Sequence, residues 1–172
     1  MTVRIEEAKL IGFPTRVSGR ETQAQAYQEA FEQSRHRVYS LAFWMTDHEL
    51  VAEEVAVNTF CLAFAFSAAP DAESVDRAFV ATLRELMPLG QPTLQCGLCS
   101  EMVSLRRNVK RVDLERAVVQ LPPTERLIFL LHDVESYDHS RIGRLLGLSR
   151  EESACGLHQA RLRLRELLAA TH

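Results

Sequence analysis

Residues 140–165 read SRIGRLLGLSREESACGLHQARLRLR and carry the most specific pattern in the chain. Ile142 and Leu146 lie one turn apart, so a short helix here has one apolar side. Gly147 suits a tight turn, and Ser149 with the glutamate three residues later has the spacing of a capping box at the start of a second helix. This pattern predicts a helix-turn-helix, whose second helix enters the major groove of DNA. Helix pairs joined by a glycine turn also occur in proteins that never bind DNA, so that alternative stays open.

The segments on either side of this stretch are also predicted to be helical. An apolar-rich helix over residues 124–134 follows the break at Pro122-Pro123, and a further helix begins at Ser100 or Val109 and ends near residue 121. The second helix of the pair runs from residue 150 to about residue 169. Its inward residues are Leu157, Ala160, Leu164, Leu167 and Leu168.

Three more helices are predicted in the first half of the chain. Apolar residues from Tyr27 to Met45 recur with a helical period, and a second helix, capped by Asp47, runs until it stops at Ala69-Pro70. A third spans about residues 73–87 and ends at a cluster of proline and glycine. Residues 1–22 show no sustained period and are interpreted as an extension, a strand or loop laid over the body.

Composition agrees with a helical fold. The chain has 172 residues, of which 47% are hydrophobic, and only 7 Gly and 6 Pro, too few for the frequent turns of a sandwich or a doubly wound sheet. We therefore predict an all-α protein of two small helical domains. The predicted boundaries are an N-terminal extension over 1–22, a helical domain over 23–87, a linker over 88–111 and a helix-turn-helix domain over 112–172.

Charge and targeting features narrow the class of protein. Residues 1–100 carry 8 Lys and Arg against 13 Asp and Glu, a net charge of −5, whereas residues 101–172 carry 12 against 10, a net charge of +2. A pI near 6.1 argues against a DNA-binding domain that acts alone. The chain shows neither a secretory signal nor an apolar run long enough to span a membrane, and four unevenly spaced cysteines fit a reducing compartment. We expect a soluble cytoplasmic protein.

The stretch over residues 121–168 resembles the C-terminal region of extracytoplasmic-function sigma factors of bacterial RNA polymerase, which reads the promoter minus-35 element. The matching positions are Leu121-Pro122-Pro123, Glu125-Arg126, Ile142, Leu146-Gly147-Leu148-Ser149 and Leu157-His158-Gln159-Ala160-Arg161. The resemblance implies promoter DNA as a partner. Together with the charge pattern, it implies DNA-binding roles for Arg141, Arg144, Ser149, Arg150, Glu151, Glu152, His158, Arg161 and Arg165.

These assignments have alternatives. Arg161 and Arg165 share one helix face, and Arg163 points elsewhere, so only part of the arginine set can reach one duplex. A surface arginine can also be simply solvated. Glu151 and Glu152 can accept from a cytosine amine, or they can serve only the helix dipole.

A second resemblance lies upstream, to the sigma-factor helical hairpin that grips the clamp coiled coil of the polymerase. It is carried by Arg37-Val38-Tyr39-Ser40-Leu41-Ala42, Met45-Thr46, Ala52-Glu53-Glu54-Val55, Thr59-Phe60 and Ala63-Phe64. It implies RNA polymerase core as a partner, contacted through Glu53, Glu54, Asn58 and Phe60. The two resemblances cover residues 27–87 and 112–168.

The sequence also departs from this family. Val57 stands where the family has a polar side chain that contacts the polymerase, which would weaken core binding. The segment expected to capture single-stranded bases of the minus-10 element offers only Phe79, Arg77 and Arg84. Promoter melting is therefore the least supported step.

No catalytic, metal or cofactor site is predicted. Cys96 and Cys99 have the spacing of a metal-ligand pair but lack a second pair, and Cys61 and Cys155 are interpreted as packing residues. Asp133, Glu135, Asp138 and His139 bracket a helix end, where such residues commonly cap and solvate. The protein is therefore not expected to be an enzyme.

The sequence thus predicts a sigma factor-like transcription initiation protein. The main alternative is a degenerate sigma-like regulator that binds an anti-sigma factor or another protein without promoter activity. A weaker one is a transcription factor that binds DNA as a dimer. Because the aromatic stripe of Phe60, Phe64 and Phe66 is wide for a three-helix domain, we also expect the two domains to pack together in the free protein.

Overall fold

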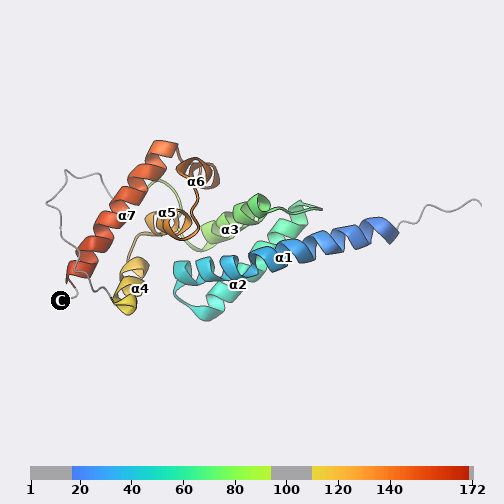
Figure 1. The fold of residues 1–172 in the computed structure, drawn as a ribbon, viewed down its shortest axis with the longest axis horizontal. Coiled ribbons are helices and arrows are strands. Elements are labelled where there is room, and N and C mark those ends of the chain that lie inside the picture. Colours follow the sequence, from blue (N-terminus) through green and yellow to red (C-terminus); the bar gives the residue numbers. More distant parts are fainter. Residues whose placement is uncertain (1–16, 94–109, 171–172) are drawn as a thin grey trace, which may run out of the picture.

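The structure is a computed structural model that describes residues 17–93 and 110–170, and every regular element in these ranges is a helix. The absence of any strand from the described residues confirms the predicted all-α class. Figure 1 shows α1, α2 and α3 at one end of the molecule and the remaining helices at the other; we call these groups the N-terminal and C-terminal halves. The elements are α1 Val17–Thr46, α2 Glu49–Phe66, α3 Ala72–Leu86, α4 Arg111–Val119, α5 Pro123–Phe129, the π-helical turn η1 Leu130–Val134, α6 His139–Leu146 and α7 Arg150–Ala170.

The N-terminal half is a hairpin of α1 and α2 with α3 packed on α2. Its core is apolar, with Val38, Leu41, Val55, Val75 and Leu83 almost completely buried. Helix α3 begins with a capping box: the Ser74 N–H donates to the Asp71 carboxylate, and the Asp71 N–H donates to the Ser74 hydroxyl, both at 2.8 Å. The N-terminal half contacts the C-terminal half through α1 and α3.

Two predictions for the N-terminal half were wrong. Helix α1 begins at Val17, so residues 17–22 are helical and not a strand or loop; residues 1–16 lie outside the described part of the chain. Gly19, which suggested a break, lies in open space, where glycine lowers helix stability by only about 1 kcal/mol. The cap of α2 is His48, whose ring accepts from the Val51 N–H, because Asp47 adopts a left-handed backbone with φ 52°.

The C-terminal half packs α4, α5 and α6 against the long α7. The predicted helix over residues 124–134 is α-helical only to Phe129 and then widens into the π-helical turn. Ser136 follows with φ 59°, and the chain enters α6 at the N-cap Asp138, which accepts from the Arg141 N–H at 2.8 Å. The predicted capping role of Asp138 is confirmed.

The two halves touch each other, but not through the predicted aromatic stripe. Phe60 and Phe64 pack within the hairpin, against Phe31 and Tyr27 with ring centroids 4.9 and 4.6 Å apart, whereas Phe66 is 83% exposed. The contacts between halves come from α3 with α6 and from the end of α1 with α4 and α5. Helices α1 and α3, not the α2 aromatics, make this interface.

The cysteines also differ from expectation. Cys61 is exposed and free, and Cys155 is disulfide-bonded, so neither is the packing thiol that the sequence suggested. The disulfide at Cys155 also departs from the expectation that the cysteines fit a reducing compartment. Cys96 and Cys99 lie outside the described residues. Among the described helices, none combines the length and apolarity that crossing a bilayer requires.

Candidate nucleic-acid interface

The turn between α6 and α7 is fixed by two glycines. Gly147 has the left-handed backbone, φ 71° and ψ 34°, that ends many helices, and the N–H groups of Gly147 and Leu148 both reach the Gly143 carbonyl. A Cβ added at Gly143 would lie only 2.6 Å from the Leu148 carbonyl oxygen. The close approach of α6 to the turn therefore depends on glycine at position 143.

Helix α7 starts with the predicted capping box. The Glu152 N–H donates to the Ser149 hydroxyl at 3.0 Å, and the Ser149 N–H donates to the Glu152 carboxylate at 2.7 Å. The bond from the Ser149 N–H to the carboxylate, followed by a bond from the Ser149 side chain, lowers the pKa of Glu152. Ser149 and Glu152 therefore cap the start of α7, and this role does not depend on DNA binding.

The buried side of α7 is held by close contacts with α5 and with the segment before residue 94. Leu157, Ala160 and Leu164 are buried, and a Cβ at Gly156 would lie 2.7 Å from Ile128 and 3.1 Å from Pro92. Gly156, unfavourable in an isolated helix, lets these elements approach. Close apolar packing therefore helps to set the orientation of α7 on the C-terminal half.

The segment before residue 94 is tied to α5 by hydrogen bonds. The Thr93 N–H donates to the buried Glu125 carboxylate at 2.5 Å, and the Gly90 N–H donates to the Thr124 hydroxyl at 3.1 Å. These partners belong to the predicted linker and the predicted helix-turn-helix domain. Residues 90–93, at the start of the predicted linker, are therefore hydrogen-bonded to the C-terminal half.

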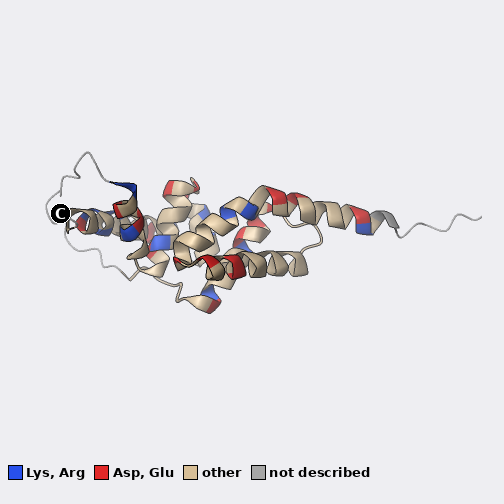
Figure 2. Ribbon diagram, turned by 90° about the horizontal axis from the view of Figure 1, so that it is seen from below, with Lys and Arg blue, Asp and Glu red and all other residues tan. Residues whose placement is uncertain are grey.

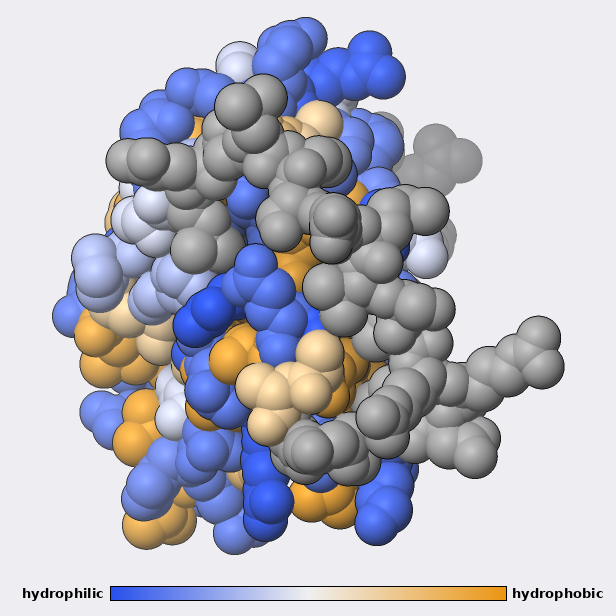
Figure 3. All heavy atoms as spheres, turned by 90° about the vertical axis from the view of Figure 1, so that its left-hand side faces the viewer, coloured by the Kyte–Doolittle hydropathy of each residue, from blue (hydrophilic) through white to orange (hydrophobic). Residues whose placement is uncertain are grey.

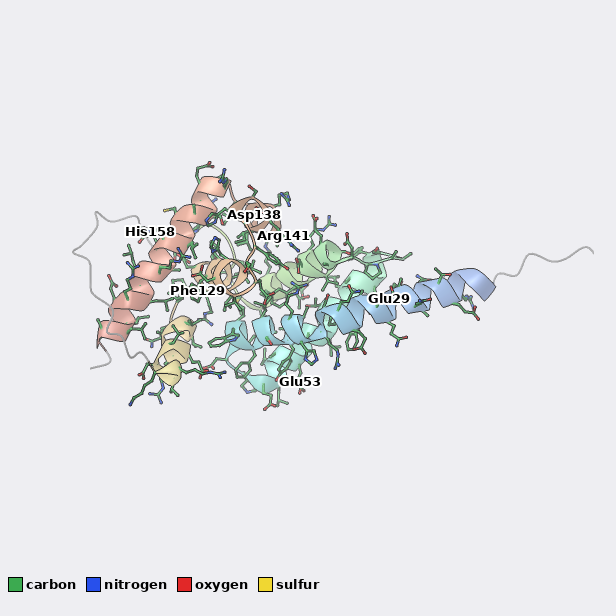
Figure 4. All side chains as sticks on the ribbon, viewed as in Figure 1. Glu29, Glu53, Phe129, Asp138, Arg141 and His158 are labelled. Carbon is green, nitrogen blue, oxygen red and sulfur yellow. The ribbon has the colours of Figure 1, made fainter. Side chains whose placement is uncertain are left out.

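The outward side of α7 carries part of the predicted DNA-binding set. Arg150, Glu151 and His158 are exposed, as is Arg144 on α6, and Arg165 is half-buried. Figure 4 shows His158 on the side of α7 that faces away from the other helices. The end of the molecule formed by α7 and α4 has a largely hydrophilic surface with scattered apolar patches (Figure 3).

Arg161, predicted to contact DNA, is held by an acid of its own chain. Its guanidinium meets the Asp133 carboxylate through two bonds of 2.5 and 3.0 Å, and His132 contacts the same carboxylate at 2.8 Å. Burial tends to raise the pKa of Asp133, but the hydrogen bonds from Arg161 and His132 outweigh it and lower that pKa. A phosphate would have to compete with Asp133 for Arg161.

Arg141 is also engaged. Its guanidinium lies 2.7 Å from the Asp76 carboxylate of α3 and 3.7 Å from the centre of the Tyr137 ring, a cation–π distance. Of the predicted DNA-binding residues, Arg144, Arg150, Glu151 and His158 are each exposed, whereas Arg141 faces the N-terminal half.

A histidine pair lies beside α7. The rings of His132 and His139 stack with centroids 4.7 Å apart, and His139 Nδ1 lies 3.1 Å from the Ser153 hydroxyl. Burial, followed by the charges of His132 and Arg150, lowers the pKa of His139. Within the described ranges, no group of three or more His, Cys, Asp or Glu residues could hold a metal ion.

The predicted polymerase-binding residues lie on α2. Helix α2 contains Glu49, Glu53 and Glu54 and neither lysine nor arginine (Figure 2). Glu53, Glu54 and Asn58 are exposed, whereas Phe60 is only 6% exposed and packs in the hairpin core.

An open apolar groove of about 570 Å³ lies between α1 and α2, and sequence reasoning missed it. Phe31, Phe60 and Phe64 line it, and Val57, 61% exposed, stands at its side. Arg35 and Glu53 give it one basic and one acidic margin. Aromatic pairs four residues apart, Tyr27 with Phe31 and Phe60 with Phe64, were the available signal.

The residues expected to handle single-stranded bases are unsuited to that task in this arrangement. Phe79 is 3% exposed in the core, and Arg84 donates to the Leu146 carbonyl at 2.9 Å. Arg77 is exposed. The α3 surface therefore offers no accessible aromatic ring from this set.

Comparison with known protein families places part of the chain in a described family model. Residues 111–164, which run from the start of α4 into α7, match the family model described as Sigma-70, region 4. The matched segment is less than a third of the chain, and it contains the helix-turn-helix described above. No curated protein matches the chain significantly. The match supports the resemblance of the C-terminal half to sigma factors, with the DNA-binding, non-enzymatic role in transcription that such a region implies.

Proposed function

We propose that this protein is a sigma factor-like transcription initiation protein that binds RNA polymerase core in the cytoplasm and directs it to promoter DNA. The observation that carries the proposal is the helix-turn-helix within the segment that matches Sigma-70 region 4, with α7 capped by Ser149 and Glu152 and its polar side open. The resemblance to the extracytoplasmic-function group supports the finer assignment.

In this proposal, the first turns of α7 read the promoter. Arg150 and Glu151 stand at the helix start and His158 two turns later, all exposed, so they can face one groove. Arg144 on α6 supplies a phosphate contact, because the first helix of such a pair crosses the DNA backbone. Glu151 can accept from a cytosine amine, and Arg150 can pair with phosphate or guanine.

The N-terminal half is proposed to bind the polymerase. Glu53, Glu54 and Asn58 form the polar part of that surface, and the groove beside Val57 forms its apolar part. Phe60 shapes the groove from the core. Attachment to the polymerase raises the effective concentration of α7 at DNA, which accounts for a chain whose overall charge is −3.

In vitro transcription with purified polymerase core tests the proposal. Core plus this protein is expected to start transcripts at sites that core alone does not use, and Arg150→Ala with His158→Ala is expected to abolish them. Arg20→Ala, an exposed arginine on α1 far from α7, is the matched control and should transcribe like the unaltered protein. Absence of new start sites, with core binding retained, would refute the proposal.

A second candidate is a sigma-like regulator that binds an anti-sigma factor or another protein without promoter activity. Buried Phe79 and the engagement of Arg141 and Arg161 by acids favour it, because each removes a group that promoter contact would use. The transcription assay separates the two: this candidate predicts retained binding to a sigma inhibitor without any promoter-dependent transcript.

A further inference from the structure

Asp76 is a buried carboxylate at the contact between the two halves. Its side chain is only 4% exposed. It accepts from Arg37 of α1 at 2.5 Å, from the Tyr137 hydroxyl at 2.8 Å and from Arg141 of α6 at 2.7 Å. Figure 4 shows Arg141 where α6 faces α3. One acid thus joins α1, α3, the 135–138 loop and α6; we call Arg37, Asp76, Tyr137 and Arg141 the Asp76 cluster.

The bonds within the cluster reinforce one another. Arg37 also donates to the Tyr137 oxygen at 2.6 Å, so the hydroxyl accepts from one side and donates to Asp76 on the other. Burial and the hydrogen bond to Asp76 raise the pKa of Tyr137 to about 12, which keeps its proton in place to donate. Two guanidinium groups face one carboxylate, so the burial of the acid is compensated by charge.

The backbone of the C-terminal half is shaped to bring Tyr137 to this point. The π-helical turn over Leu130–Val134 and the positive φ of Ser136 precede it, and the Tyr137 N–H donates to the Leu131 carbonyl at 2.9 Å. π-helical turns and positive φ angles at non-glycine residues are uncommon and tend to occur where function requires them. Here these features place Tyr137 so that its hydroxyl contacts Asp76 in the N-terminal half.

Hydrogen bonds from two arginines to backbone carbonyls flank the cluster. Arg126 of α5 donates to the Met45 carbonyl at the end of α1, at 2.8 Å, and Arg84 of α3 donates to the Leu146 carbonyl at the end of α6, at 2.9 Å. Among the ion pairs of the described residues, Arg141 with Asp76 is the one that joins the halves. Its loss would therefore remove the ion pair between the halves and leave these arginine–carbonyl hydrogen bonds in place.

We propose that the Asp76 cluster is an autoinhibitory latch: it holds α6 against α3, and the Asp76 carboxylate occupies the guanidinium of Arg141 that a DNA phosphate would otherwise take. The claim about DNA rests on the proposed function; the claim that the cluster closes the molecule does not. The first helix of a helix-turn-helix crosses the DNA backbone, so α3 packed on α6 blocks that approach on the side of Arg141, whereas Arg144 stays exposed. DNA binding requires the halves to separate.

The fraction of molecules held closed by the latch determines how much DNA affinity should rise when the latch is removed. If the binding-competent form is a fraction of the population, the apparent Kd is the intrinsic Kd divided by that fraction. Asp76→Asn keeps the shape of the side chain and removes its charge, so each guanidinium loses its ionic partner. We expect at least about a tenfold increase in the separated form, and an apparent affinity of polymerase-bound protein for promoter DNA that rises by up to the same factor.

Small-angle scattering and hydrogen exchange of the full chain test the latch without DNA. Asp76→Asn should enlarge the radius of gyration and increase exchange in α6, while circular dichroism shows unchanged helix content. Glu85→Gln changes an exposed acid on α3, the helix that carries Asp76, and is the matched control. It should leave the radius of gyration and the exchange in α6 unchanged. If Asp76→Asn fails to fold, Tyr137→Phe, which keeps the ring under Arg141 and removes only the hydroxyl, should give a smaller change of the same sign.

The outcomes separate the latch from the proposed function. Scattering and exchange that stay the same in Asp76→Asn and Tyr137→Phe overturn the latch. Separation of the halves without tighter promoter binding, when the unaltered protein does bind promoters with polymerase, overturns the competition between Asp76 and phosphate. Failure of every variant and of the unaltered protein to act with polymerase refutes the proposed function, and the scattering result then still decides whether the cluster closes the molecule.

Discussion

Gly143 is the point where α6 and the following turn come closest, and a methyl group there gives a sharp test of the turn geometry. The added Cβ would lie 2.6 Å from the Leu148 carbonyl oxygen, about 0.8 Å inside the 3.4 Å at which ordinary van der Waals contact begins. The atom it meets belongs to the backbone of the turn, so a side-chain rotation cannot relieve the contact. The turn itself has to move.

The magnitude follows from two opposing terms. Overpacking costs typically 1 to 3 kcal/mol, and the upper end, about 3 kcal/mol, applies where a backbone carbonyl must shift. Alanine gains about 1 kcal/mol over glycine inside a helix. Gly143→Ala should therefore lower the free energy of unfolding by about 2 kcal/mol, which corresponds to a fall in Tm of roughly 4 to 8 °C for a chain of this size.

Urea unfolding, followed by circular dichroism, measures this difference. Gly19→Ala is the matched control, because Gly19 lies in α1 with no atom within 4 Å of the added Cβ, and it should leave stability unchanged or raise it by up to about 1 kcal/mol. A Gly143→Ala protein as stable as the unaltered one, alongside the expected behaviour of Gly19→Ala, would show that α6 does not approach the turn as described.

Three further outcomes are expected. Ser149→Ala should reduce stability by about 0.5 to 2 kcal/mol because it removes half of a capping box, as thermal unfolding would show; Ser140→Ala, exposed on α6, should have little effect. Asp133→Asn should lower the free energy of unfolding by less than about 1 kcal/mol, because the Asp133–Arg161 pair is partly exposed. Since folding lowers the pKa of Asp133, this loss should be seen above about pH 4 and should vanish as the pH falls further. An equal loss of stability at all pH values would contradict the ion pair. In an ultraviolet titration, one of the three tyrosines should ionise only near pH 12, and Tyr137→Phe should remove that step; because the folded pKa is raised, the associated stability is present below pH 10 and lost above it.

The helix-turn-helix was predictable because its signals are local. The cap at Asp138, the left-handed Gly147 and the reciprocal bonds of Ser149 and Glu152 all depend on residues within four positions of one another. The same holds for the apolar spacing that buries Ile142 and Leu146. Sequence therefore located both helices of the pair, and the bounds predicted for the second agree closely with α7.

The contact between the halves was predicted, but for the wrong reason. The aromatic residues of α2 suggested excess apolar surface, and Phe60 and Phe64 instead found partners within the hairpin. Asp76 gave no local sign of burial, since its partners lie 39, 61 and 65 residues away in the chain. A buried acid is detectable only once the helices that bring its partners are placed.

The same reasoning changes how the arginines of the C-terminal half should be counted. Sequence treats Arg141 and Arg161 as two of several free cations, but Asp76 and Asp133 neutralise them in the folded chain. Phosphate contacts provide most of the sequence-independent affinity for DNA, so each engaged arginine lowers it. In the proposed function, the closed chain holds a duplex weakly because Arg141 and Arg161 are engaged, and the polymerase supplies the remaining affinity through effective concentration. The pairing of arginines with acids of the same chain is thus a physical reason why such a protein would act on DNA only when bound to its partner.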